Sequence, residues 1–127
     1  MKAAAGLALL AAAACVNVAP PGDATTLAAG ERAYQKCYSC HSLEGQDPTT
    51  QGPSLKAIVG RAVAAEPGFA YSPKMRAFAA GQPRWSRAAL DAFIADPQAV
   101  VPDNEMGFFG ISDAEERRAL IAFLARS

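Results

Sequence analysis

The sequence has a single histidine, only three cysteines and no excess of either charge among its 127 residues. Twelve basic and twelve acidic side chains cancel, so the broad electropositive surface that binds nucleic acid is not expected. Three cysteines are too few for a disulfide scaffold. No apolar run reaches the roughly 20 residues that cross a bilayer. The chain, with 51% hydrophobic residues, is expected to form one globular domain with one core.

The N-terminal segment has the pattern of an export signal. Lys2 precedes an apolar run that ends at Val16, which matches a short basic region followed by a hydrophobic region. Three alanines stand directly before Cys15. They fit the small-residue rule of ordinary signal cleavage, and they also resemble the end of a lipoprotein signal, in which Cys15 would be lipidated. Both alternatives predict an exported protein, either periplasmic or anchored to the membrane.

Three segments follow from this pattern. Residues 1–14 are the export signal, of either the lipoprotein type or the ordinary type. Residues 15–26 contain two prolines and a glycine without helical periodicity, which predicts a flexible tether. Residues 27–127 form the domain.

Helix signals recur along the domain. Apolar residues spaced three and four apart, together with helix-start signals, predict helices at 27–36, 74–80, 87–96 and from 112 towards the C-terminus. Serines are the expected N-caps of the last three, namely Ser72, Ser86 and Ser112. Ser112 would form a capping box with Glu115, and Pro97 would end the third helix. Segment 44–68 is rich in glycine and proline and predicts loop. The expected fold class is all-α with long loops.

The only histidine stands at the end of the run Cys37-Tyr38-Ser39-Cys40-His41. This is the attachment motif of a c-type haem, in which two thiols three positions apart reach the two vinyl groups and the adjacent imidazole reaches the iron. The haem would also supply apolar core to a loop-rich chain. We therefore expect one haem c, covalently bound through Cys37 and Cys40, with His41 as an iron ligand.

Three other interpretations of the cysteine pair remain open at this point. A structural zinc site needs four ligands, and beyond His41 the chain offers only the remote Cys15. A thioredoxin-like dithiol needs alternating strands and helices, whereas this pattern is helical. A structural disulfide suits an exported protein but leaves the adjacent histidine unexplained.

The iron needs a sixth ligand or an open position, and methionine is the available side chain. Met75 lies in a predicted helix, where a methionine most often fills core. Met106 lies in a loop between a proline-containing segment and Gly107, and a loop can bring it over the haem from the opposite side. We expect Met106 to be the sixth ligand.

The motifs of the domain resemble, in their order along the chain, those of class I cytochromes c. The resemblance covers 27–127 and is carried by the haem-attachment motif, Gly52-Pro53, Gly60-Arg61, the run from Pro67 to Ser72, Trp85, and the run from Pro102 to Gly110. It is nearest to the mitochondrial-type branch and its bacterial monohaem relatives. The resemblance implies three main helices, with short helices and long loops, wrapped around one haem.

Several residues acquire expected roles from this resemblance. The Pro53 carbonyl would orient the ring of His41, and Phe108 would cover the haem edge. Hydrogen bonds to the haem propionates would come from Arg61, Tyr71, Ser72 and Trp85. Where the terminal helices cross, Gly30 and Tyr34 would pack against Leu120 and Phe123.

The chain departs from the family pattern in two places. Phe93 stands where the family often has a tyrosine near the methionine sulfur, so a hydrogen bond to Met106 would be missing. Glu105 stands beside Met106, and there are few lysines, where mitochondrial members surround the haem edge with lysine. This argues against a strongly acidic partner.

The expected function is single-electron transfer by a monohaem cytochrome with His41 and Met106 as axial ligands, and not enzymatic catalysis, because both positions on the iron would be filled. Its partners would be redox proteins such as respiratory complexes, oxidases or dehydrogenases, and the protein itself is expected to be a monomer. The alternative is a peroxidase-like or gas-binding protein with an open sixth position.

Overall fold

A computed structural model describes residues 22–127 of the chain. The predicted export signal, Cys15 and most of the predicted tether lie outside these residues. The helices of the described part are α1 (Ala24–Tyr34), α2 (Pro73–Gly81), α3 (Arg87–Ala95), α4 (Pro97–Val100) and α5 (Ala114–Leu124). This part has no strand, only an isolated antiparallel bridge between Ala62 and Arg84. The all-α prediction is therefore confirmed.

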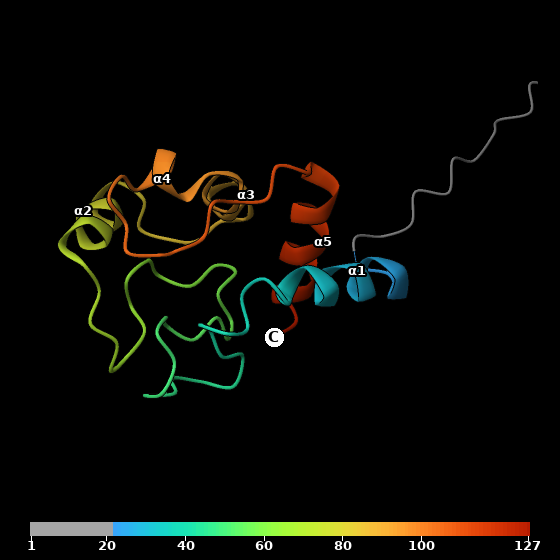
Figure 1. Ribbon diagram of the computed structural model, residues 1–127, viewed down its shortest axis with the longest axis horizontal. Helices are drawn as coiled ribbons and strands as arrows, with labels where there is room; N and C mark the ends of the chain where they lie inside the picture. Colours follow the sequence, from blue (N-terminus) through green and yellow to red (C-terminus); the bar gives the residue numbers. More distant parts are fainter. Residues whose placement is uncertain (1–21) are drawn as a thin grey trace, which may run out of the picture.

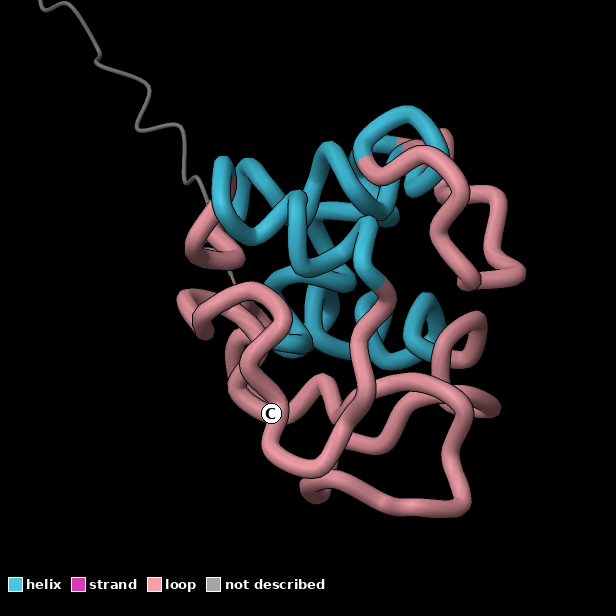
Figure 2. Tube along the Cα trace, turned by 90° about the vertical axis from the view of Figure 1, so that its left-hand side faces the viewer, coloured by secondary structure: helices cyan, strands magenta, loops and turns pink. Residues whose placement is uncertain are grey.

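The helices gather on one side of the long connection between α1 and α2. Figure 1 shows α1 and α5 side by side, with α3 next to α5 and the green loops of the connection opposite α2, α3 and α4. Helix α5 packs against both α1 and α3, and α3 packs against α4. Figure 2 shows the same division, with helices above and most of the loops below. No helix in 22–127 has the length and apolar character needed to cross a membrane.

Two of the predicted helix starts agree with the structure. The Ser72 hydroxyl accepts the Met75 N–H at 3.2 Å at the start of α2, and Ser86 does the same for Ala89 at 3.0 Å at the start of α3. Pro73 occupies the first turn of α2, where its missing N–H costs no helical hydrogen bond. Local capping chemistry thus determines where these two helices begin.

Helix α1 begins and ends earlier than predicted. Asp23, placed in the tether by the sequence interpretation, is its N-cap, and its carboxylate accepts the Thr26 N–H at 2.7 Å. This hydrogen bond lets the helix include residues 24–26, because it satisfies the Thr26 N–H, which has no acceptor within the helix. The last helical residue is Tyr34, and the chain continues through 35–40 as turns.

The expected capping box at Ser112 was wrong. Asp113 is the N-cap of α5, and its carboxylate accepts the Glu116 N–H at 2.7 Å. The Ser112 carbonyl instead accepts a hydrogen bond from Arg117 at 2.9 Å. An aspartate beside a serine competes for the same role, and its negative charge is favoured at a helix N-terminus.

Pro97 ends α3 as predicted, but it also begins α4, which the sequence interpretation did not include. The Asp96 carboxylate accepts the Ala99 N–H at 3.1 Å, so this residue is both the C-cap of α3 and the N-cap of α4. Pro97 therefore occupies the first turn of a new helix, the position at which proline fits best.

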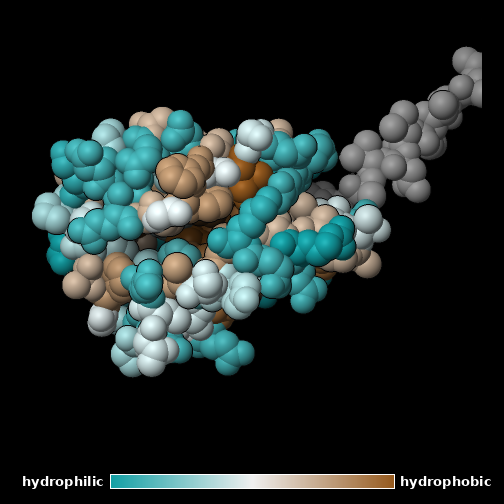
Figure 3. Space-filling view, in the orientation of Figure 1, coloured by the Kyte–Doolittle hydropathy of each residue, from teal (hydrophilic) through white to brown (hydrophobic). Residues whose placement is uncertain are grey.

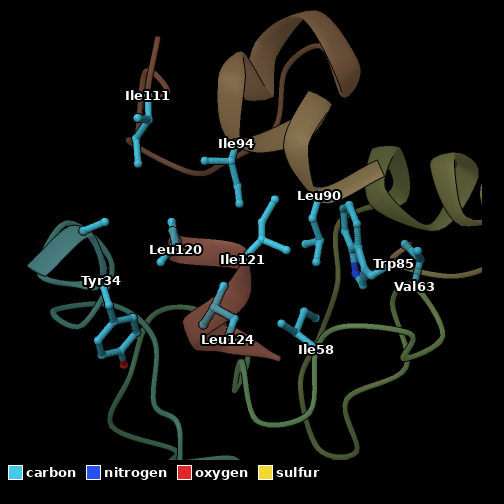
Figure 4. Packing of buried hydrophobic residues seen from close by; sticks show 11 residues of the cluster. Tyr34, Ile58, Val63, Trp85, Leu90, Ile94, Ile111, Leu120, Ile121 and Leu124 are labelled. Atoms are coloured by element: carbon cyan, nitrogen blue, oxygen red, sulfur yellow. The ribbon is translucent and has the colours of Figure 1, made fainter. Parts of the chain in front are cut away.

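The core lies between α3 and α5 and continues to Trp85. Figure 4 shows Leu90 and Ile94 of α3 pointing towards Leu120 and Ile121 of α5. The loop residues Ile58 and Val63 and the Trp85 side chain extend the same cluster. A single core thus joins the terminal helix to the loops, as expected for one domain.

Gly30 sets the distance between α1 and α5. A Cβ at this position would lie 2.2 Å from the Ala119 carbonyl oxygen and 2.5 Å from the Cβ of Phe123. The Tyr34 ring packs on Phe123, with ring centroids 5.8 Å apart. The predicted contacts of Gly30 and Tyr34 with Phe123 are thus present, and the closest neighbour of Gly30 is the Ala119 backbone, which the sequence interpretation did not name.

Gly30→Ala is expected to destabilise the fold by about 1–3 kcal/mol, because a methyl group must displace backbone rather than a flexible side chain. Gly81→Ala is the matched control, since Gly81 is also helical and its Cβ would meet nothing within 4 Å. This control should be neutral or stabilising. Denaturant unfolding of the purified proteins measures both, and equal stability of the two variants would contradict the close crossing.

Candidate functional site

The cysteine motif continues α1 as a sequence of tight turns. The Cys40 N–H donates to the Cys37 carbonyl at 3.1 Å, and the His41 N–H donates to the same carbonyl at 3.0 Å. The Tyr34 hydroxyl donates to the His41 carbonyl at 2.6 Å. Burial raises the pKa of the Tyr34 phenol, so it remains a protonated donor. The end of α1 therefore fixes the backbone on both sides of the two cysteines.

Cys37 and Cys40 are partly buried and are not joined by a disulfide. Burial raises the pKa of the Cys37 thiol to about 11. Across 22–127, no group of three or more His, Cys, Asp or Glu side chains is arranged to hold a metal ion.

The imidazole of His41 is held in one orientation. Its Nδ1 lies 2.7 Å from the Pro53 carbonyl oxygen, the contact that the resemblance implied. A carbonyl only accepts, so Nδ1 carries the proton and Nε2 presents its lone pair. Burial lowers the pKa of His41, although the Pro53 hydrogen bond acts in the opposite direction. A neutral imidazole with a free Nε2 is the form that binds a metal.

Gly52 forms one side of the space that the His41 ring occupies. A Cβ on Gly52 would lie 2.4 Å from Cε1 and 2.9 Å from Nε2 of the ring. The Gly52 N–H donates to the Cys40 carbonyl at 2.8 Å. The 41–53 loop therefore folds back so that glycine backbone lies against the imidazole, and no other residue fits there without displacement.

Arg61 lies among loop carbonyls and one carboxylate. Its two terminal nitrogens donate to the Ser54 and Lys56 carbonyls, at 2.8 and 2.9 Å, and to the Glu66 carboxylate at 2.8 Å. Its Nε is buried and has no hydrogen-bond partner within the described residues. An unpaired buried guanidinium nitrogen is costly, and the carboxylate of a haem propionate would satisfy it.

Tyr71 and Ser72 also have hydroxyl protons to donate. The Tyr71 oxygen accepts the Glu66 N–H at 3.0 Å, and the Ser72 oxygen accepts the Met75 N–H at 3.2 Å. An oxygen that accepts one hydrogen bond can still donate its own proton. The Ser72 side chain can therefore cap α2 and donate to an anion at the same time. These hydroxyls and the Arg61 Nε fit the carboxylates of a haem.

Trp85 is buried within an aromatic group. Its ring lies 5.7 Å from that of Phe78 and 5.1 Å from that of Phe93, measured between centroids. Its main chain is paired with the Arg61 loop, since the Trp85 N–H donates to the Arg61 carbonyl at 2.9 Å. Arg61 and Trp85, to which the resemblance assigns hydrogen bonds with the haem propionates, are thus joined by their backbones.

Met106 lies in the loop between α4 and α5, and the loop is attached at both ends. The Asn104 side chain accepts the Met106 N–H and donates to the Val101 carbonyl, both at 2.9 Å. At the other end, the Ile111 N–H donates to the Ile94 carbonyl at 2.9 Å. The loop is therefore held to the end of α3 without any strand.

The other residues singled out near this loop differ in exposure. Phe108 is partly buried against the core, whereas the adjacent Phe109 is 92% exposed. Met75 packs partly buried against the core from α2, in agreement with the packing role inferred for it. Figure 3 shows hydrophobic residues at the bottom of a hollow in the face of the molecule seen in Figure 1.

Sequence reasoning missed Glu66 and Phe109. Glu66 carries no local signal, because its partner Arg61 is five residues away in a loop without periodicity. The order of two adjacent phenylalanines likewise does not reveal which one faces solvent. Arg117 was also missed, although it donates to Asp91 at 2.7 Å and to the Ile111 carbonyl at 2.9 Å, and so joins α5, α3 and the end of the Met106 loop.

Comparison with known proteins identifies one family. The family model described as Cytochrome c matches residues 27–127. A solved structure, cytochrome cH from Methylobacterium extorquens, superposes with a TM-score of 0.70 and 34% identity, covering 80% of this chain and 98% of that one. The family model thus matches the residues over which the motifs resemble class I cytochromes c.

Curated relatives agree with this match. A cytochrome c of Chlamydomonas reinhardtii is 36% identical over 86% of this chain and 93% of its own length. A cytochrome c2 of Rhodomicrobium vannielii is 34% identical over 76% of this chain and 74% of its own length. A c-type cytochrome cy of Rhodobacter capsulatus is 35% identical over 87% of this chain. The alignment spans only 54% of the length of this last protein.

Gly52→Ala is expected to lower the proportion of chains that carry covalently bound haem, because its methyl group would occupy the position of the His41 ring. The readout is visible haem absorption relative to protein absorption, and a several-fold loss is expected. Gly81→Ala, with open space around its Cβ, should load normally. Normal loading of both variants would show that the His41 ring is not confined by Gly52.

Proposed function

This chain belongs to the cytochrome c family and binds one covalently attached haem c, and we propose that His41 and Met106 are the axial ligands of its iron. The protein is an electron-transfer haem protein of the class I, all-α type. The observation that carries the proposal is the His41 imidazole, whose Nδ1 is bonded to the Pro53 carbonyl so that Nε2 is left to bind iron. Bound haem supplies an iron that gains and loses one electron.

Cys37 and Cys40 are the attachment points, and the local backbone determines how they act. They lie three positions apart in turns that are closed by hydrogen bonds to the Cys37 carbonyl. The Tyr34 hydroxyl holds the same segment through the His41 carbonyl. The thiols and the imidazole therefore belong to one rigid unit, which limits the reorganisation that accompanies a change in the charge of the iron.

Met106 supplies the weaker ligand. A thioether is a poor electron donor, so it favours the ferrous state and a comparatively high reduction potential. An apolar surrounding acts in the same direction, because burying the additional charge of ferric haem is costly. The attachment of the loop at Asn104 and at Ile111 supports a fixed position for the Met106 sulfur.

Haem carboxylates are proposed to be held by Arg61, Tyr71, Ser72 and Trp85. The unpaired Nε of Arg61 is the strongest support, because a buried donor without a partner is rare in native proteins. Phe108 is proposed to cover one edge of the haem. With both axial positions filled, the iron has no open site for a substrate, and we propose an electron carrier without enzymatic activity.

One observation favours the alternative of an open sixth position. Phe93 packs on Trp85 and has no hydroxyl with which to support the Met106 sulfur. Weaker retention of Met106 would let peroxide or a diatomic gas reach the iron. Carbon monoxide therefore separates an electron carrier from a gas-binding or peroxidase-like protein.

Met106→Leu is expected to abolish the near-infrared sulfur-to-iron charge-transfer band and to let the reduced protein bind carbon monoxide. The wild-type protein should show the band and should not bind the gas. Met75→Leu is the matched control, because the same substitution is made at a methionine that packs against the core. A wild-type protein that binds carbon monoxide at once would contradict Met106 ligation.

We propose further that the protein is exported to the periplasm, where it exchanges electrons with redox proteins such as respiratory complexes, oxidases or dehydrogenases, and that it is a monomer. The apolar segment before Cys15 supports export. Cys15 supports a lipid tether, which would hold the carrier near membrane-bound partners.

Cys15→Ser tests the tether in the intact precursor. If Cys15 is lipidated, the wild-type protein should enter the detergent phase on phase separation, and Cys15→Ser should move it to the aqueous phase or leave it unprocessed. A wild-type protein already in the aqueous phase, with a mass that shows no lipid, would contradict the tether and leave ordinary export.

A further inference from the structure

Glu66 forms an ion pair with Arg61 that is largely withdrawn from solvent. The Arg61 and Glu66 side chains are 18% and 12% exposed, and a terminal nitrogen of Arg61 lies 2.8 Å from a Glu66 carboxylate oxygen. Buried charges are retained in proteins only when they are paired and hydrogen-bonded. This pair is therefore a feature of the site rather than an incidental surface contact.

The backbone of Glu66 is held by the same group of residues. Its N–H donates to the Tyr71 hydroxyl at 3.0 Å. The terminal nitrogens of Arg61 also bind the Ser54 and Lys56 carbonyls. Glu66 is the one charged group bonded to the guanidinium in the described residues, and it leaves the buried Nε without a partner. The terminal nitrogens of Arg61 thus bind protein groups, and the buried Nε is available to bind a ligand.

We propose that Glu66 is a positioning residue that compensates the charge of Arg61, so that the arginine binds a haem carboxylate without adding net positive charge beside the iron. This inference rests on the proposed function, in which the Arg61 Nε donates to a propionate. It goes beyond that function because it assigns the reduction potential partly to a carboxylate that touches neither the haem nor the iron.

The sign of the effect follows from electrostatics. Ferric haem carries one more positive charge than ferrous haem, so an uncompensated Arg61 disfavours the ferric state and raises the reduction potential. Glu66 cancels this contribution at short range and in a poorly solvated setting. Its presence lowers the potential relative to a site that has Arg61 alone. Arg61 thereby supplies the hydrogen bond that holds the haem carboxylate, while Glu66 offsets the effect of the Arg61 charge on the reduction potential.

The experiment is redox titration of haem-loaded variants. Glu66→Gln keeps an acceptor for the Arg61 nitrogen but removes the charge, and it should raise the midpoint potential. Arg61→Gln should lower it. The double variant Arg61→Gln/Glu66→Gln should return close to the wild-type potential. Exposed residues of α1 provide the matched set, namely Glu31→Gln, Arg32→Gln and their double variant, whose shifts should be much smaller.

The double variant keeps the test decisive if a single variant does not load haem. Breaking a buried pair leaves one charge unpaired, whereas replacing both partners is tolerated better. A double variant whose potential falls well below that of the wild type would overturn the proposal. Such a fall would mean that Glu66 does not compensate the charge of Arg61 in the wild-type protein. A shift for Glu66→Gln no larger than that for Glu31→Gln would overturn it as well.

Absorption spectra of the same samples distinguish failure of this inference from failure of the proposed function. A wild-type protein without the methionine charge-transfer band, or one that binds carbon monoxide, contradicts Met106 ligation whatever the potentials are. An intact band in all variants, together with an unchanged potential in Glu66→Gln, contradicts only the role of Glu66.

Discussion

The close contact between α1 and α5 at Gly30 is the constraint on which the rest of the structure depends. The absence of a side chain lets the α1 backbone approach the Ala119 carbonyl and Phe123. This contact places Tyr34 at the end of α1, where its ring packs on Phe123 and its hydroxyl holds the His41 carbonyl. The segment that carries the cysteines and the histidine is therefore attached to the crossing of α1 and α5.

The loops are organised by side chains that bind backbone rather than by strands. Asn104 closes the segment before Met106, and Arg61 gathers the carbonyls of the 54–56 segment. Each of these two side chains makes two hydrogen bonds to backbone groups that have no strand partner. The Nε of Arg61 is buried without a hydrogen-bond partner in the described residues, which supports the proposal that this loop binds an anionic group.

Particular elements show why some structural features were predictable. The starts of α2 and α3 depend on a serine and on the residues that follow it, so local sequence is sufficient. The start of α5 was assigned to Ser112 although Asp113 caps it, because two capping residues stand side by side and local sequence does not choose between them. The start of α1 was placed too late for a related reason, since Asp23 follows two prolines and a glycine, a composition typical of a loop.

The sequence by itself determined the helical class and the cysteine and histidine motif, because each depends on residue type and short spacing. The preference for Met106 over Met75 as the sixth ligand also comes from the sequence, and it stays a prediction. Tertiary structure alone decided that Gly52 lies against the His41 ring, that Glu66 forms an ion pair with Arg61, and that Phe109 faces solvent while Phe108 packs inward. These contacts join residues in irregular loops, where no periodicity relates position in the chain to direction in space. Only the folded arrangement of the loops brings such residues together.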